Sequence, residues 1–208
     1  MALARTMATR DISTHEHAQR VRRYAKVLAA QADVPGPEVI QAIETAAQLH
    51  DIGKLAIPDR LLNKPGPLTA GEYEQVKQHA AIGADLLAGV SSNALLALFV
   101  RHHHENWDGT GYPDGRRGDE IPIGARVLAI TDCYDALTSN RPYRRALAPH
   151  AAIAMIRERR GSMFDPELTD AFLKIVWRMR PASSGHRPLT SRRPRVADTA
   201  LVMAASAQ

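Results

Sequence analysis

The sequence predicts an all-α protein, and two observations carry this prediction. Apolar residues recur at helical spacing along most of the chain, and glycines and prolines separate the periodic segments. No alternating run of apolar and polar residues is convincing enough to predict a sheet. Several histidines and aspartates fall on the apolar sides of the predicted helices, where ionisable groups are uncommon.

Length and composition favour one globular domain. The 208 residues are 45% hydrophobic and 24% charged, which supports a packed core. We assign residues 1–180 to this domain and expect residues 181–208 to form a disordered basic tail. Residues 178–208 hold six arginines and one aspartate, a net charge of +5 that equals the net charge of the whole chain. The basic charge therefore gives no support to specific nucleic-acid binding.

The sequence also predicts a cytoplasmic protein without membrane attachment. No run approaches the roughly 20 apolar residues that span a bilayer, and the N-terminus lacks the apolar stretch of a secretory signal. Cys133 is the single cysteine, so a disulfide within the chain is excluded.

Two helices are predicted before the first His-Asp doublet. The first runs from about residue 14 to residue 30, and His17 shares its apolar face with Val21 because the two are four residues apart. The second follows Pro37, and its apolar stripe leads at helical spacing to His50. Both histidines are therefore expected to point inward.

The third helix begins after a segment that we predict to be a loop. Residues 55–68 follow the HDIGK motif and are rich in proline. Thr69 and Glu72 have the spacing of a capping box, which begins the helix. On it, His79 is expected on the core side together with Leu86.

A fourth helix and a long loop follow. The helix begins near Asn93 and ends at three consecutive histidines, residues 102–104. Residues 105–122 are dense in Gly, Pro and Asp, and structureless loops of this length are usually functional. We therefore expect this loop to lie over a site.

The remaining chain predicts three more helices. The first follows Pro122 and places Asp132 and Asp135 on its core side. The other two span about residues 149–160 and 166–180, and each begins with a proline in the first turn.

The inward-facing ionisable groups together predict a multinuclear metal site. Each alone is explained as a hydrogen-bonded core residue, but burying so many without a partner would be costly, whereas divalent ions turn that cost into coordination bonds. Nitrogen and oxygen donors without thiolates favour iron, manganese or similar ions. The seven candidates are His17, His50, Asp51, His79, His103, His104 and Asp132.

Three motifs in order, LHDIGK, HHENWDGTGYP and DCYDALTSNRPYR, resemble the HD-GYP family. The resemblance covers about residues 11–172. It implies an HD-domain-like bundle of about seven helices that holds two or three metal ions. It also implies hydrolysis of cyclic di-guanosine monophosphate (cyclic di-GMP) to linear pGpG, to GMP, or to both, by a metal-activated hydroxide.

The resemblance implies roles for individual positions. The seven candidates would be metal ligands, with Asp51 bridging two ions, and Lys54 would be a catalytic cation near the scissile phosphate. Asp135 would orient a ligand or the substrate, although a helix-capping role explains it equally well. His102 has no matching role, so we expect it at the surface or behind the ligands. The expected substrate-binding residues are Lys54, Gly111, Tyr112, Pro113, Asp135, Arg141 and Arg144.

Ser13 sets the expected number of ions at two. Members with three ions resemble one another in placing a glutamate four residues before the first ligand histidine, and here that position is Ser13. A neutral hydroxyl is a poor ligand for a hard or borderline cation.

Two other functions stay open. One is a phosphohydrolase of the wider HD superfamily that acts on another nucleotide, and the other is a catalytically silent module that binds a cyclic dinucleotide or a protein. A signalling partner or a homodimer is compatible with all three functions.

Overall fold

The computed structural model describes residues 12–140 and 145–179. These residues form α-helices and short 3-10 helices, and no strand occurs among them. The prediction of an all-α protein is confirmed. The α-helices are α2 (Ile12–Gln31), α3 (Pro37–Leu49), α4 (Asp59–Leu62), α5 (Ala70–Val90), α6 (Ala94–His102), α7 (Ile123–Thr138), α8 (Pro149–Glu158) and α9 (Pro166–Ile175). The 3-10 helices are η1 (Ile52–Ala56), η2 (Gly118–Glu120) and η3 (Val176–Arg178).

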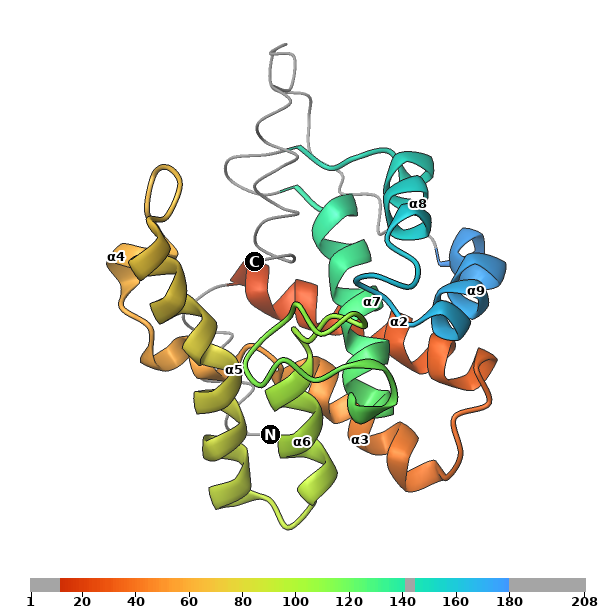
Figure 1. The fold of residues 1–208 in the computed structure, drawn as a ribbon, viewed down its shortest axis with the longest axis horizontal. Coiled ribbons are helices and arrows are strands. Elements are labelled where there is room, and N and C mark those ends of the chain that lie inside the picture. The colour runs from red at the N-terminus through yellow and green to blue at the C-terminus, as the bar shows by residue number, and fades with distance from the viewer. Residues whose placement is uncertain (1–11, 141–144, 180–208) are drawn as a thin grey trace.

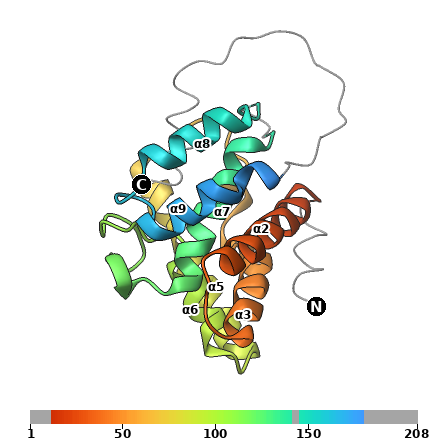
Figure 2. The same ribbon diagram turned by 90° about the vertical axis from the view of Figure 1, so that its right-hand side faces the viewer.

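Helix α7 is the central element of the bundle. It packs against α2, α3 and α6 on one side and against α8 and α9 on the other (Figure 1). Helix α5 packs on α6 and also on η1, so the HDIGK segment, which follows α3, lies against α5. The second view shows α2 and α3 side by side, with α9 against α2 (Figure 2).

The core explains why these segments form helices that pack as they do. Every described face predicted to be apolar contributes buried side chains, and the largest fully buried ones include Tyr24, Phe99, Tyr134 and Phe172. Tyr134 on α7 packs edge-on against Tyr24 on α2 and against Phe172 on α9. Aromatic contacts of this kind favour edge-to-face geometry. They fix α7 against the helices on both sides.

Most predicted helix ends are confirmed. Thr69 accepts a hydrogen bond from the Glu72 amide, and the Glu72 carboxylate accepts one from the Thr69 amide, so the capping box begins α5 as expected. Asn93 caps α6, and the Asp165 side chain accepts two amide hydrogen bonds at the start of α9.

Three sequence predictions about this fold were wrong. Residues 55–68 are not all loop, because they include the end of η1 and the short helix α4, which Pro58 precedes. Helix α9 ends at Ile175 and continues as η3, so it is shorter than the predicted 166–180. Leu86 is 44% exposed, since the buried stripe of α5 follows the four-residue spacing of His79, Gly83 and Leu87.

Other predictions concern residues outside the part of the chain that the structure describes. Arg141, Arg144 and residues 181–208 lie outside the described residues, so their predicted roles stay predictions. Within the described ranges, the longest helices are too short or too polar to cross a bilayer. Cys133 is buried.

Candidate metal centre

Three histidines reach the centre of the bundle with the same ring orientation. The Nδ1 atoms of His50, His79 and His103 donate hydrogen bonds to the backbone carbonyls three residues earlier, at 3.0, 2.7 and 2.6 Å. His50 and His103 stand at helix ends, where carbonyls lack helical partners. A carbonyl only accepts, so each Nδ1 carries the proton and each Nε2 presents a lone pair.

His17 is oriented by a carboxylate instead of a carbonyl. Its Nδ1 donates to Oδ2 of Asp135 at 2.7 Å, and both side chains are buried. Its Nε2 then lies 3.3 Å from Nε2 of His50 and 3.2 Å from Oδ1 of Asp132. Two imidazole lone pairs this close need a proton or a cation between them.

The candidate ligands form two groups joined by one carboxylate. Potential ligand atoms of each group lie within 4.8 Å of one another. Asp51 lies between the groups, with Oδ2 3.6 Å from Nε2 of His50 and Oδ1 3.6 Å from Nε2 of His79. We call these sets the α5–α6 group (His79, His103, His104) and the α2–α7 group (His17, His50, Asp132).

The residues fit divalent metal ions. Nε2 of His79 and Nε2 of His103 are buried and have no hydrogen-bond partner, which is costly for a buried polar atom. Both belong to the α5–α6 group, and both rings are held with that nitrogen turned inward. Ions coordinated by these nitrogens and by the carboxylates of Asp51 and Asp132 would satisfy them.

The two groups differ in their protonation when no ion is bound. Burial and neighbouring positive groups lower the pKa of His79 to about 4 and that of His103 to about 3. Burial also opposes the charge on His17, but hydrogen bonds to Asp132 and Asp135 raise its pKa to about 9. The α5–α6 group therefore presents neutral ligands at pH 7, whereas the α2–α7 group holds a proton.

This difference predicts two distinct pH dependences for metal binding. A His17 ring with a pKa of about 9 is protonated below pH 9, so an ion must displace that proton. The affinity of the α2–α7 group should fall by about tenfold for each unit of pH below 9. His79 and His103 are already neutral above pH 6. The affinity of the α5–α6 group for an ion should therefore be almost independent of pH above 6. Manganese titrations at pH 6.5, 7.5 and 8.5 measure both constants, and equal pH slopes for the two would contradict this assignment.

Gly53 explains how the HDIGK segment reaches the centre. A Cβ atom at Gly53 would collide with the backbone carbonyl of His79, so only glycine lets η1 approach α5 this closely. The approach places Asp51 beside His79. Nζ of Lys54 donates to Oδ2 of Asp51 at 2.7 Å, and 39% of the Lys54 side chain is exposed. Burial opposes the charge on Asp51, but Lys54 and the nearby histidines lower its pKa well below the ordinary value.

The GYP triplet packs against the candidate ligand His104. A Cβ atom at Gly111 would collide with the backbone of Glu105 and Asn106, so glycine is needed for the loop to fold back. The Tyr112 amide donates to the His104 carbonyl at 3.1 Å, and the Tyr112 ring stacks on the His104 ring with centroids 4.8 Å apart. Pro113 is exposed at the loop surface. The triplet therefore supports His104 from outside.

Glu105 and His102 anchor this loop, a role that the sequence predicted for neither. Glu105 is 2% exposed and accepts hydrogen bonds from the amides of Asp114 and Arg116. His102 is buried, and its ring nitrogens bond to the Leu98 carbonyl and to Asp114. The only sequence feature that pointed to a role for Glu105 was its position directly after the three histidines. His102 was expected at the surface or behind the candidate ligands, and it lies behind them.

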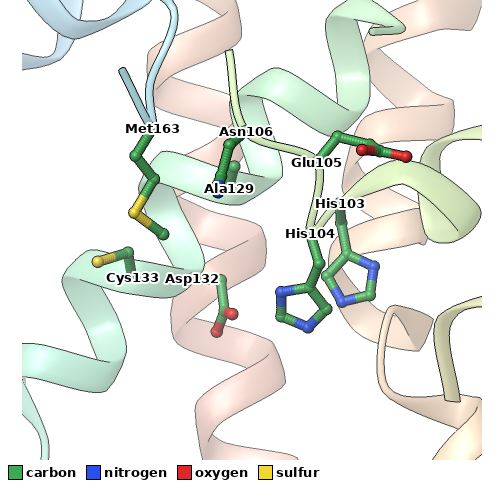
Figure 3. A pocket seen from close by; sticks show the side chains of 8 residues that line it. All are labelled: His103, His104, Glu105, Asn106, Ala129, Asp132, Cys133 and Met163. Atoms are coloured by element: carbon green, nitrogen blue, oxygen red, sulfur yellow. The ribbon is translucent and has the colours of Figure 1, made fainter. Parts of the chain in front are cut away.

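Residues of both groups also line a small pocket, open in part to solvent, with room for about one water molecule. Figure 3 shows the His103 and His104 rings and the Asp132 carboxylate turned toward one space, with Met163 and Cys133 away from the histidines. A small oxygen ligand that enters this pocket would meet residues of both groups.

Comparison with known proteins identifies the family. Residues 2–168 match the family model described as HD domain. The chain belongs to the HD domain family. Over 83% of its length this HD domain is 45% identical to the cyclic di-GMP phosphodiesterase response regulator RpfG of Xanthomonas campestris. The HD-GYP resemblance of its motifs is thereby confirmed.

Solved structures share the fold. Bd1817, a HDG"Y"P protein from Bdellovibrio bacteriovorus, matches with a TM-score of 0.65 and 18% identity over 79% of this chain and 52% of that chain. The cyclic GMP-AMP specific phosphodiesterase V-cGAP3 of V. cholerae matches with a TM-score of 0.61 and 19% identity, over 91% of this chain and 53% of that chain. The HD-domain bundle is therefore confirmed. The match to RpfG covers 46% of the RpfG length.

The structure brings together all seven predicted ligands, and Lys54, Gly111 and Tyr112 lie next to them. Asp135 is fully buried and bonds to His17, which fits the orientation of a ligand better than contact with substrate. No helix-capping bond of its side chain occurs among the described hydrogen bonds.

Proposed function

We propose that this HD domain is a metal-dependent phosphodiesterase that hydrolyses cyclic di-GMP to pGpG, to GMP, or to both. The observation that carries the proposal is the convergence of histidine Nε2 atoms, each with its Nδ1 already bonded, around the carboxylate of Asp51. The substrate follows from the identity to RpfG, which is named a cyclic di-GMP phosphodiesterase.

The proposal includes two divalent ions, iron or manganese. The α5–α6 group would hold one ion and the α2–α7 group the other, with Asp51 contacting both. Histidine nitrogens and carboxylate oxygens without thiolates suit these ions. Two groups with one bridging carboxylate match the arrangement of two-metal sites that cleave phosphate esters.

The residues of the chain would hold and orient the reacting groups. Bound divalent ions would lower the pKa of coordinated water and withdraw charge from the phosphodiester. In hydrolysis the water oxygen bonds to phosphorus and the water loses a proton, the bond from phosphorus to the ribose oxygen breaks, and the leaving oxygen takes up a proton in turn. Lys54, whose side chain is partly exposed beside Asp51, would neutralise charge on the phosphate or the leaving oxygen. Arg141 and Arg144 are proposed to hold phosphate and guanine.

A substrate panel tests the proposal. Protein stripped of metal and reloaded with manganese is incubated with cyclic di-GMP, cyclic GMP-AMP, cyclic di-AMP and nucleoside phosphates, and the products are separated. We expect cyclic di-GMP to be hydrolysed fastest, with loss of activity in chelator. Faster hydrolysis of cyclic GMP-AMP, the substrate named for V-cGAP3, would contradict the proposed substrate but not the proposed metal-dependent hydrolysis. Binding without hydrolysis would favour the silent module.

Several expectations extend this proposal. A signalling partner or a homodimer would couple the domain to an input, and a cytoplasmic location would give it access to a nucleotide messenger. These remain predictions from the sequence and the relatives.

The basic tail is expected to be dispensable for turnover. Residues 185–208 follow the last predicted helix, and we propose no contact between them and the substrate. Their deletion should leave kcat and KM for cyclic di-GMP within about twofold of wild type. Steady-state kinetics of both proteins at equal salt measure this, because salt screens any contribution of the arginines. A large rise in KM would show that the tail binds substrate.

A further inference from the structure

We infer that Arg20 is a positioning residue for the metal ligand His17 and acts through Asp135. Arg20 lies on α2, three residues after His17, and Asp135 lies on α7. This inference rests on the two-ion site proposed above. It adds a residue that bonds to no expected metal ligand among the described interactions.

Three hydrogen bonds from Arg20 and Ser139 hold the Asp135 carboxylate in one orientation. Nε of Arg20 donates to Oδ1 at 2.6 Å, and Nη2 of Arg20 donates to Oδ2 at 3.1 Å. The Ser139 hydroxyl lies 3.3 Å from Oδ2, and Nη2 of Arg20 also donates to that hydroxyl at 3.1 Å. A forked guanidinium pair fixes both the plane and the direction of a carboxylate.

The fixed carboxylate determines which nitrogen of His17 faces the ligands. Oδ2 of Asp135 is 2.7 Å from Nδ1 of His17, and the Asp135 side chain is only 1% exposed, so water does not compete for this bond. An ionised carboxylate only accepts, so the neutral His17 ring that binds an ion keeps its proton on Nδ1 and offers Nε2 to the ion. Carboxylates that orient metal-bound histidines in this way contribute to metal affinity.

The position of Arg20 distinguishes this role from an ordinary surface ion pair. Its side chain is 20% exposed, whereas Glu16, its other acidic neighbour, is 71% exposed and 3.7 Å away. Among the described residues, the short contacts of Arg20 lead inward to Asp135 on α7 and to Ser139 at its C-terminal end. The inference assigns the α2–α7 group a supporting shell of Arg20, Ser139 and Asp135.

Arg22 provides a matched control on the same helix. Its Nε and Nη2 donate to Oε2 of Glu44 on α3 at 3.1 and 2.9 Å. It is therefore also an arginine of α2 that pairs with a carboxylate of another helix, but Glu44 contacts no candidate ligand among the described interactions. Arg22→Met removes an ion pair between helices without touching His17.

The test measures manganese binding by the metal-stripped full chain. We expect Arg20→Met to weaken one of the two binding constants by about tenfold or more and to leave the other within about twofold. Anomalous diffraction at limiting manganese should then show the loss at the α2–α7 group. Arg22→Met should bind both ions like wild type, although its melting temperature falls.

Two further outcomes decide the inference. Arg20→Met with both binding constants equal to those of wild type would overturn it, even if stability falls, because Arg20 would then be only structural. If Arg20→Met does not fold, Arg20→Lys decides, since lysine keeps the charge but loses the forked pair. It should show a smaller, still selective weakening, and unchanged constants would overturn the inference. Wild-type protein that binds no manganese would overturn both this inference and the two-ion proposal.

Discussion

Replacement of Asp51 by alanine should reduce hydrolysis of cyclic di-GMP to less than a tenth of wild type while the protein stays helical. Asp51 is the only described carboxylate within 4 Å of histidines from both groups. Its loss removes a ligand from each proposed ion and the partner of Lys54. A tenfold loss corresponds to about 1.4 kcal/mol in the activation barrier. We expect a larger effect, because a bridging carboxylate serves both proposed ions.

Initial rates at saturating manganese, together with circular dichroism, measure this effect. Asp170→Ala is the matched control, because Asp170 pairs with Arg160 on the surface of α9, outside both ligand groups. It should retain activity near wild type. Activity of Asp51→Ala above a tenth of wild type would show that the carboxylate does not bridge the reacting centre.

Replacement of Gly53 by alanine should cost both stability and activity. The added methyl group would overlap the backbone of His79 and Gly83, and backbone cannot give way as a flexible side chain can. We expect η1 to move away from α5, which separates Asp51 from His79. Overpacking of this kind typically costs about 1–3 kcal/mol, and we expect kcat to fall by at least tenfold.

Gly89→Ala separates this effect from a general response to glycine replacement. A Cβ atom at Gly89 on α5 would meet nothing within 4 Å, so this variant should keep wild-type activity and gain up to about 1 kcal/mol. Chemical denaturation and initial rates of the two variants provide the comparison. Wild-type activity in Gly53→Ala would mean that close packing of η1 on α5 is not needed for the site.

The fold and the inward position of the candidate ligands could be predicted because local patterns encode them. Apolar spacing placed His17, His50 and His79 on buried faces, and the capping box placed the start of α5. The same reasoning placed Leu86 in the core, where it is 44% exposed. Helical spacing alone does not tell which edge of an apolar stripe the neighbouring helix covers.

The supporting residues could not be predicted in the same way. Arg20 is a polar residue on a partly polar helix, and only its partner on α7, 115 residues later, gives it a role. The anchoring of the GYP loop by Glu105 likewise depends on a fold of the loop that sequence spacing does not specify. Local patterns therefore identified the residues that face the centre, whereas the residues behind them became visible only through contacts between helices.

Anomalous diffraction from crystals grown with excess manganese tests the two-ion account most directly. We predict two peaks within about 4 Å of each other, the usual separation in two-metal sites. One should lie among His79, His103 and His104, and the other among His17, His50 and Asp132, with Asp51 in contact with both. A single peak, or a third fully occupied peak beside Ser13, would contradict the account.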